Sequence, residues 1–163
     1  MIKYTITQAF DYPLAQLLAA REDRYKYLDK FPDLKNVTLL EEKKEGDKIF
    51  QKRSVSLARS IPQVLQPVLG DTGLYEESVF YISTNTHEFL FYPPNNKNVV
   101  TITGKSVYSE LSESKSQRVY QCEVKSTVFM ISGIIEAAIE EIHKHSLEKD
   151  KNSILNFLQS KLT

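Results

Sequence analysis

The sequence predicts an α+β fold in which a curved antiparallel sheet of six to seven strands wraps around one long C-terminal helix. Three observations predict it. Residues 2–10 alternate apolar and polar side chains, several short alternating segments follow between residues 37 and 128, and a helical apolar stripe fills residues 131–161. A sheet followed by one helix with a wide apolar face buries both surfaces best when the sheet curls around the helix.

The first strand is expected to lead directly into a short helix. The alternation over residues 2–10 is typical of a half-buried strand. Asp11 is expected to act as the N-cap of the helix, with Pro13 in its first turn, where the missing N–H costs nothing. A short helix after the first strand is therefore part of the predicted fold.

Six further strands are predicted, mostly in a meander. Two strands joined by a tight turn at Gly46 are expected near 37–43 and 47–57, and four more at 75–83, 87–93, 98–111 and 117–128. Gly104 is the residue expected to permit a bulge in the long strand. Between these two groups, residues 61–70 have apolar side chains at helical spacing, with Pro67 inside and Gly70 at the end, which predicts a short amphipathic helix or turn.

The C-terminal helix is predicted over about 131–161, weakened near residues 150–152. Its apolar stripe consists of Ile131, Ile135, Ala138, Ile139, Ile142, Leu147, Ile154, Leu155, Leu158 and Leu162. We expect Ile135, Ile139 and Ile142 to be buried against the concave face of the sheet.

Composition limits the classes of function. The 163 residues suit one domain spanning 1–163, and 21 Lys plus Arg balance 21 Asp plus Glu, so charge alone would not attract nucleic acid. The single cysteine, Cys122, excludes an intramolecular disulfide and is expected to be a buried, inert thiol. With neither a signal peptide nor a membrane-length apolar run, the chain is expected in the cytoplasm, with at most transient membrane contact. The oligomeric state stays open.

The layout resembles a known superfamily. The segments Tyr4–Phe10 and Asp11–Leu18, together with the closing helix Ile131–Leu162, resemble the START-like or birch-pollen-allergen-like helix-grip domains, also termed SRPBCC. Two branches are similar: an uncharacterised bacterial family with a turn like Ser132–Glu136, and PRELI-like phospholipid carriers with a segment like Ile61–Leu65. The resemblance implies a ligand cavity between sheet and helix, with lipid transfer and polyketide cyclisation among the activities of the superfamily.

No catalytic or metal-ligating set emerges from the sequence. His143 and His145 are two residues apart on a helix and point away from each other, and His87 is expected in a turn, so the three are interpreted as solvated or capping residues. Adjacent carboxylates such as Glu76 and Glu77 are interpreted as solvated surface groups. We therefore expect no cofactor, no metal and no assigned catalytic residue.

The remaining signal is aromatic and aliphatic and favours an apolar binding site. The candidate ligand-binding residues are Tyr75, Tyr81, Phe89, Phe91, Tyr108 and Tyr120 on the sheet, Ile135, Ala138, Ile139 and Ile142 on the helix, and Val64, Leu65 and Val68 in the segment 61–70. That segment is interpreted either as a gate over the cavity mouth or as a static cap.

Three functions stay open. The first is binding, and carrying, a hydrophobic small molecule or lipid, which the sequence favours over catalysis. The second is a cyclase- or hydratase-like enzyme of the same superfamily, which a deep polar pair such as Arg53 and Glu110 would favour. The third is a protein-interaction module with a filled core, which the absence of a cavity would favour.

Overall fold

A seven-stranded antiparallel sheet forms one layer of the molecule. The computed structural model describes residues 1–56, 61–69 and 73–161. Within them the strand order is β1-β7-β6-β5-β4-β3-β2, so the chain from β2 to β7 is a continuous meander and β1 joins it beside β7. The strands are β1 (Ile2–Phe10), β2 (Val37–Glu45), β3 (Lys48–Val55), β4 (Leu74–Tyr81), β5 (Thr86–Tyr92), β6 (Val100–Ser112) and β7 (Lys115–Ser126). The predicted α+β fold is confirmed.

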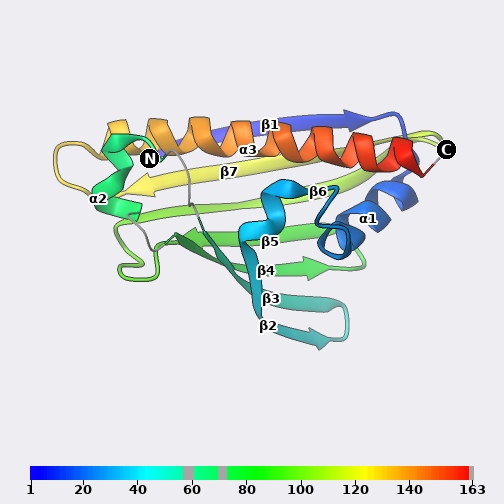
Figure 1. Ribbon diagram of the computed structural model, residues 1–163, viewed down its shortest axis with the longest axis horizontal. Helices are drawn as coiled ribbons and strands as arrows, with labels where there is room; N and C mark the ends of the chain where they lie inside the picture. The colour runs from blue at the N-terminus through cyan, green and yellow to red at the C-terminus, as the bar shows by residue number, and fades with distance from the viewer. Residues whose placement is uncertain (57–60, 70–72, 162–163) are drawn as a thin grey trace.

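One long helix and several short ones form the second layer. Helix α3 (Ser132–Ser160) runs along the sheet beside β1 and β7 in Figure 1. The shorter elements are α1 (Leu14–Asp23), α2 (Gln66–Leu69) and the 3₁₀ turns η1 (Arg24–Lys26), η2 (Pro32–Asn36) and η3 (Gln63–Leu65). Helix α3 continues through residues 150–152, so the weakening expected there is wrong.

The buried face of α3 differs from the predicted stripe at one position. Ile135 and Ile139 are 0% and 5% exposed, as predicted, but Ile142 is 37% exposed. At 100° per residue, Ile142 lies at the edge of a face whose centre runs through Ile139, Asp150 and Phe157. The prediction that Ile142 is buried is therefore wrong.

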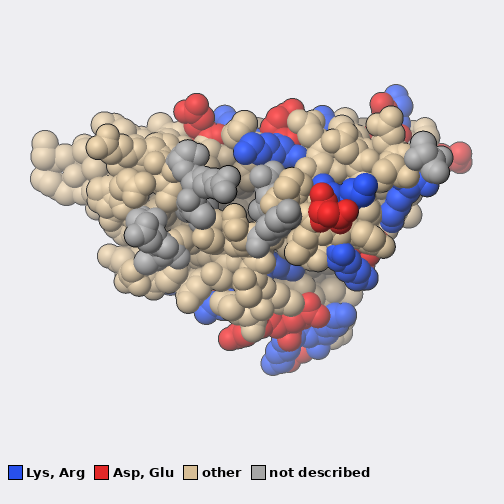
Figure 2. All heavy atoms as spheres, viewed as in Figure 1, with Lys and Arg blue, Asp and Glu red and all other residues tan. Residues whose placement is uncertain are grey.

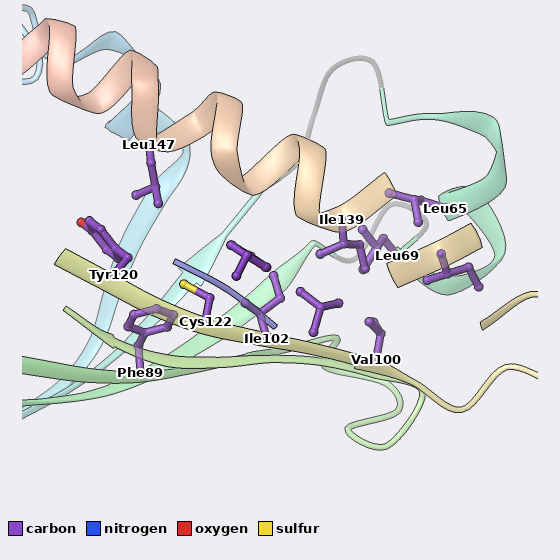
Figure 3. Close-up of a cluster of buried hydrophobic side chains, with 12 residues drawn as sticks. Leu65, Leu69, Phe89, Val100, Ile102, Tyr120, Cys122, Ile139 and Leu147 are labelled. Atoms are coloured by element: carbon purple, nitrogen blue, oxygen red, sulfur yellow. The ribbon is translucent and has the colours of Figure 1, made fainter. Parts of the chain in front are cut away.

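The apolar core falls into two clusters along α3. The first, drawn in Figure 3, joins the N-terminal half of α3 to the sheet and includes Phe89, Ile102, Tyr120, Ile139 and Leu147. The second joins α1 to the C-terminal half of α3 and consists of Phe10, Leu17, Ala20, Phe31, Tyr108, Ile154, Phe157 and Leu158. Packed side chains therefore hold the sheet and the helices together along both halves of α3.

Two turn predictions have opposite outcomes. Gly46 has a φ of +56° in the β2–β3 turn, which confirms the tight hairpin. At α1, however, Pro13 is the N-cap and no side chain caps the helix. Asp11, expected in that role, is exposed and lies 3.9 Å from the Lys115 amine, because the helix begins two residues later than the sequence suggested.

Gly104 does not form the predicted bulge. The register of β6 is unbroken there, since Gly104 is paired with Phe89 on one side and Cys122 on the other; the register shift in this strand lies between Glu110 and Ser112. A Cβ at residue 104 would lie 2.5 Å from the Gln121 carbonyl oxygen and 2.9 Å from the Phe89 ring. Glycine therefore allows the Phe89 ring to lie close against the backbone.

The segment between β3 and β4 packs on the end of the sheet–helix space. Leu65 is 0% and Leu69 4% exposed, and both belong to the first core cluster. Pro67 is accommodated because it lies in the first turn of α2, where its missing N–H is not needed. The predicted stop at Gly70, the end of the predicted strand at Leu57 and the stripe residue Leu162 lie outside the described residues.

Charge is unevenly distributed over the surface. Figure 2 shows Lys, Arg, Asp and Glu gathered over the β2–β3 hairpin and the end that carries α1, with few where β7 meets α3. Strand β2 is an edge strand with Glu41, Glu42, Lys43 and Lys44 exposed, a pattern that discourages pairing with another chain. Phe129, in the β7–α3 connection, is 88% exposed.

The packing of α3 on the sheet predicts the effect of a charge at its centre. Ile139→Asp should lower the free energy of unfolding by about 3 kcal/mol or more, because a carboxylate would enter the apolar cluster without a partner. Ile134→Asp, on the same helix at a position 59% exposed, is the matched control and should change stability little. Chemical denaturation measures both, and equal stability of the two variants would contradict this packing.

Candidate ligand-binding cavity

A cavity lies between the concave face of the sheet and the middle of α3. Its volume is about 190 Å³. The apolar part of its wall consists of Phe31, Leu34, Val37, Val55, Phe89, Phe91, Tyr108, Tyr120 and Leu147. Alternate residues of β3 and β5 reach it because successive side chains of a strand point to opposite faces.

The cavity adjoins an apolar pocket of about 310 Å³ near the N-terminal half of α3. The two share Val55, Phe91, His143 and Ser146, so they lie directly against each other. The remaining wall of the pocket is mostly aliphatic and consists of Ile61, Leu69, Leu74, Val100, Ile102, Ile139, Ile142, His145 and Lys149. The segment 61–69 therefore contributes to this pocket through Ile61 and Leu69.

The opposite end of the cavity meets a polar cleft of about 490 Å³ between α1 with η1 and strands β2 to β4. Residues shared by the cavity and the cleft are Arg24, Tyr25, Val37, Arg53, Glu76 and His87. The site thus changes from aliphatic at one end to charged at the other.

Asp150 of α3 is the centre of a buried ionic network. Arg24 Nη1 donates to both carboxylate oxygens at 3.2 and 3.1 Å, and Arg118 Nη1 of β7 lies 2.9 Å from Oδ2. Burial alone would raise the pKa of the Asp150 carboxyl, but the two guanidinium groups outweigh it and hold that pKa below its usual range. The carboxylate therefore stays ionised and ties α3 to both η1 and the sheet.

The Arg118 side chain has a second polar partner besides Asp150. This side chain is 0% exposed, and its Nε donates to Gln8 Oε1 of β1 at 2.7 Å. The Gln8 amide in turn donates to the Leu147 carbonyl oxygen at 3.1 Å, one turn before Asp150. This chain of contacts holds the Arg118 guanidinium against the helix in one orientation.

Arg53 is buried, and its partner is Glu76 rather than Glu110, the example considered above. Its Nη1 lies 3.5 Å from Glu76 Oε1 of β4, the residue opposite it in the ladder, whereas Glu110 is exposed. The deep pair named as favouring an enzyme thus forms between Arg53 and Glu76 and not with Glu110, which lies near the far end of β6. Burial raises the pKa of Glu76 despite the opposing fields of Arg53, Arg24 and Arg21, so this carboxyl is more easily protonated than an exposed one.

Two histidines lie inside, contrary to the expectation of solvated residues. The Tyr4 hydroxyl is 2.6 Å from His143 Nδ1, and burial lowers the pKa of that imidazole to about 4. His87 is in β5 rather than a turn, and burial together with Arg21, Arg24 and Arg53 holds its pKa well below the usual range. Both rings are neutral near pH 7, whereas His145 is exposed.

The structure brings only some of the predicted binding residues together. Phe89, Phe91, Tyr108 and Tyr120 line the cavity, and Ile139 and Ile142 line the apolar pocket. Ile135, Ala138, Val64, Leu65 and Val68 pack in or against the first core cluster without lining either space. Tyr75 and Tyr81 alternate with Leu74, Glu76 and Phe80 along β4 and so lie on the convex face, which corrects the expectation that they face α3.

The charged residues of the site were not predicted, although the sequence contains a pattern that indicates them. Gln8 and Arg118 occupy inward positions of alternating strands, in phase with Phe10 and Tyr120. Asp150 is eleven residues after Ile139, which is three helical turns, and thus lies within the buried face. Polar residues at apolar positions in the pattern were the signal that could have revealed this network.

Other chemistry is not apparent in the described residues. Burial raises the pKa of the Cys122 thiol to about 11, which leaves it protonated. Residues 1–56, 61–69 and 73–161 contain no group of three or more His, Cys, Asp and Glu arranged to hold a metal ion. No helix in the same ranges combines the length and the apolarity that crossing a membrane requires.

Comparisons with known proteins identify a family and a fold. A family model described as "Protein of unknown function (DUF2505)" matches residues 5–158. No curated protein matches the sequence.

Several solved structures share the fold at low identity. The Zhui aromatase/cyclase from Streptomyces sp. R1128 is 13% identical with a TM-score of 0.69, over 99% of this chain and 96% of that one. A START superfamily protein from Mycobacterium smegmatis is 11% identical with a TM-score of 0.60, over 99% of both chains. The protein Ara h 8.0201 is 10% identical with a TM-score of 0.64, over 98% of both chains. The resemblance to START-like and birch-pollen-allergen-like helix-grip proteins is confirmed at the level of the fold.

The Asp150 network predicts a specific dependence of stability on pH. Asp150→Asn should cost about 3 kcal/mol at neutral pH, because two buried guanidinium groups lose their carboxylate. A carboxyl whose pKa is lowered by folding stabilises the folded state at pH values above its unfolded-state pKa of about 3.9. That stabilisation is lost as the pH falls through its pKa in the folded state. The difference in unfolding free energy between wild type and Asp150→Asn should therefore be constant above about pH 5 and become smaller below about pH 4.

Urea denaturation from pH 7 to pH 3 measures this difference. Asp11→Asn removes a carboxylate that is 89% exposed and should leave the profile unchanged. A stability gap for Asp150→Asn that does not narrow in acid would show that the carboxylate charge is not what the network uses.

Proposed function

The chain belongs to the DUF2505 family. We propose that this protein binds and carries a hydrophobic small molecule or lipid between the sheet and α3. The observation that carries the proposal is that two hollow spaces adjoin inside the fold. The cavity and the apolar pocket share four wall residues, and their other walls are predominantly aromatic and aliphatic.

The dimensions support this function. The pocket of about 310 Å³ alone is at the lower end of the range of small-molecule sites, about 300 to 1,000 Å³, and the cavity extends it inward. The few polar groups along the apolar stretch, His143 and Ser146 at the junction, would orient a ligand without making the wall hydrophilic. Hollow spaces of this size also argue against an interaction module with a filled core.

Entry at the segment 61–69 follows from its position. Ile61 and Leu69 contribute to the pocket wall, while Leu65 is fully buried on α3. A ligand entering here would meet aliphatic side chains first and aromatic ones deeper inside. The segment would then act as the gate of the carrier.

An enzyme of the cyclase or hydratase type is the second candidate, and the buried ionic network favours it. Glu76 lies at the inner end of the cavity with a raised pKa, as a general acid requires, and Arg53 and Arg24 are beside it. The comparison with an aromatase/cyclase supports the same idea only through the shared fold.

One experiment separates the carrier from the enzyme. Native mass spectrometry of the purified protein should show a bound apolar compound, which is extracted, returned to ligand-free protein and incubated. Recovery of the same mass supports a carrier. A new mass that wild type produces and Glu76→Gln does not would replace the carrier by the enzyme.

A substitution at the junction of the two spaces tests ligand binding directly. Ser146→Phe should weaken binding of 1-anilinonaphthalene-8-sulfonate at least tenfold, because the new ring would occupy the volume shared by pocket and cavity. The wild-type residue is exposed, so the fold should tolerate the change. Ala137→Phe adds the same ring at an exposed position of α3 outside both spaces and should bind normally.

Fluorescence titration of the three proteins gives the result. Equal affinity of wild type and Ser146→Phe, with both folded by circular dichroism, would exclude this space as the binding site. So would the failure of wild type to bind either this probe or a fluorescent fatty acid.

A further inference from the structure

The charged end of the cavity holds more positive than negative charge. Arg21, Arg24 and Arg53 line the cleft at this end, and the ion pair with Asp150 brings Arg118 to the same cluster. In the part of the chain that the structure describes, the carboxylates that pair with these arginines are Glu76 and Asp150. Four guanidinium groups against two carboxylates leave two positive charges uncompensated.

Arg21 is the clearest part of this surplus. Its guanidinium lies 4.0 Å from the centre of the Phe80 ring and 5.9 Å from that of Tyr108, and it makes no ion pair with any described residue. Its Nε is buried and without a hydrogen-bond partner among those residues. The side chain is thus positioned by aromatic packing, with donors left over.

Other buried polar atoms around the same point are also without partners in the described chain. Arg24 Nε and His87 Nε2 are buried without partners in the described chain, and both residues line the junction of cavity and cleft. Buried polar groups are nearly always paired, and a buried cation without a counter-charge is costly. A cluster of this kind is favourable when an anion completes it, and the planar forks of arginine match the oxygens of a carboxylate or phosphate.

This inference rests on the proposed function and deepens it: we propose that the ligand is an amphipathic organic anion, bound by its oxyanion group at Arg21, Arg24 and Arg53. Its apolar part runs past Phe91 toward Ile139 in the aliphatic pocket. The two ends of the site then match the two ends of one molecule.

Glu76 is the group at this junction that opposes an incoming anion. It is paired with Arg53 and lies in the fields of three arginines, yet burial still raises its pKa. It is therefore the carboxylate that is most easily neutralised when a second negative charge enters. Asp150 is held ionised by two arginines of its own and does not compete for Arg21 or Arg53.

Wild-type protein tests the charge requirement without any substitution. Fluorescence titration compares 11-(dansylamino)undecanoic acid with its methyl ester, which has the same apolar chain but no charge. The acid should bind at least tenfold more tightly. Equal affinities would overturn the anion inference and leave the hydrophobic carrier intact, whereas binding of neither probe would overturn the proposed function itself.

Competition identifies the oxyanion. Dodecanoate, dodecyl phosphate and dodecanol are each used to displace the bound fluorescent acid. Displacement by either anion at one tenth of the dodecanol concentration or less supports the proposal, and the more effective anion identifies a carboxylate or a phosphate head group. Displacement by dodecanol at the same concentration as both anions contradicts it.

Arg21→Met locates the anion within the site. The change removes a charge without leaving a carboxylate unpaired and replaces the guanidinium over the Phe80 ring with an apolar side chain of similar length, so the protein should remain folded. Affinity for the acid should fall at least tenfold while affinity for the ester is unchanged. Lys52→Met, one residue from Arg53 on the opposite face of β3 and stacked on Tyr75, is the matched loss of charge and should bind as wild type.

The comparison of the two variants decides the location. If Arg21→Met and Lys52→Met lose the same affinity for the acid, the effect is one of overall charge and the assignment of the oxyanion to this cluster fails. Should Arg21→Met not fold, the comparison of acid with ester in wild type still decides whether an anion is required.

Discussion

The interior of this protein is organised around one buried carboxylate, that of Asp150. It lies in the middle of the apolar face of α3, where an isolated charge would be strongly unfavourable. Arg24 and Arg118 make the position tolerable, and each comes from a different part of the chain. The helix can therefore settle on the sheet in one register, because sliding by a turn would separate the carboxylate from both partners. We take orientation of α3, rather than net stability, as the main effect of this network.

The same network lies where the polarity of the space between sheet and helix changes. The first core cluster packs apolar side chains along the N-terminal half of α3, and the second does so near α1 and Phe157. Between them the chain places guanidinium groups and carboxylates that need room and partners, so close apolar packing stops. The cavity, the aliphatic pocket and the polar cleft are thus three parts of one gradient in polarity, with Phe91 near one end and Arg53 near the other.

Sequence periodicity predicted the fold well because the buried residues of the strands and of α3 recur at the regular spacing of a strand or a helix. The alternation of β1 and the stripe of α3 were sufficient to place both elements within a residue or two. It could not show which face of β4 is concave, so Tyr75 and Tyr81 were placed inside although Glu76 is the inward residue. Pairing between distant residues was also invisible: Arg53 meets Glu76 through the ladder of β3 and β4, which no local pattern encodes. His143 was missed although it follows Ile139 by four residues and so lies on the buried face of α3, where its ring meets the Tyr4 hydroxyl of β1.

The close approach at Gly104 bears on how this fold could acquire new ligands. Phe89 rests on the bare backbone of that residue while also forming part of the cavity wall. A side chain at position 104 would press on both the Phe89 ring and the Gln121 carbonyl oxygen, so it would shift the cavity wall together with the backbone of β7, without replacing a residue that lines the cavity. Position 104 is thus a point at which a single mutation could redirect ligand size during divergence of the family, while the charged end of the site remained as it is.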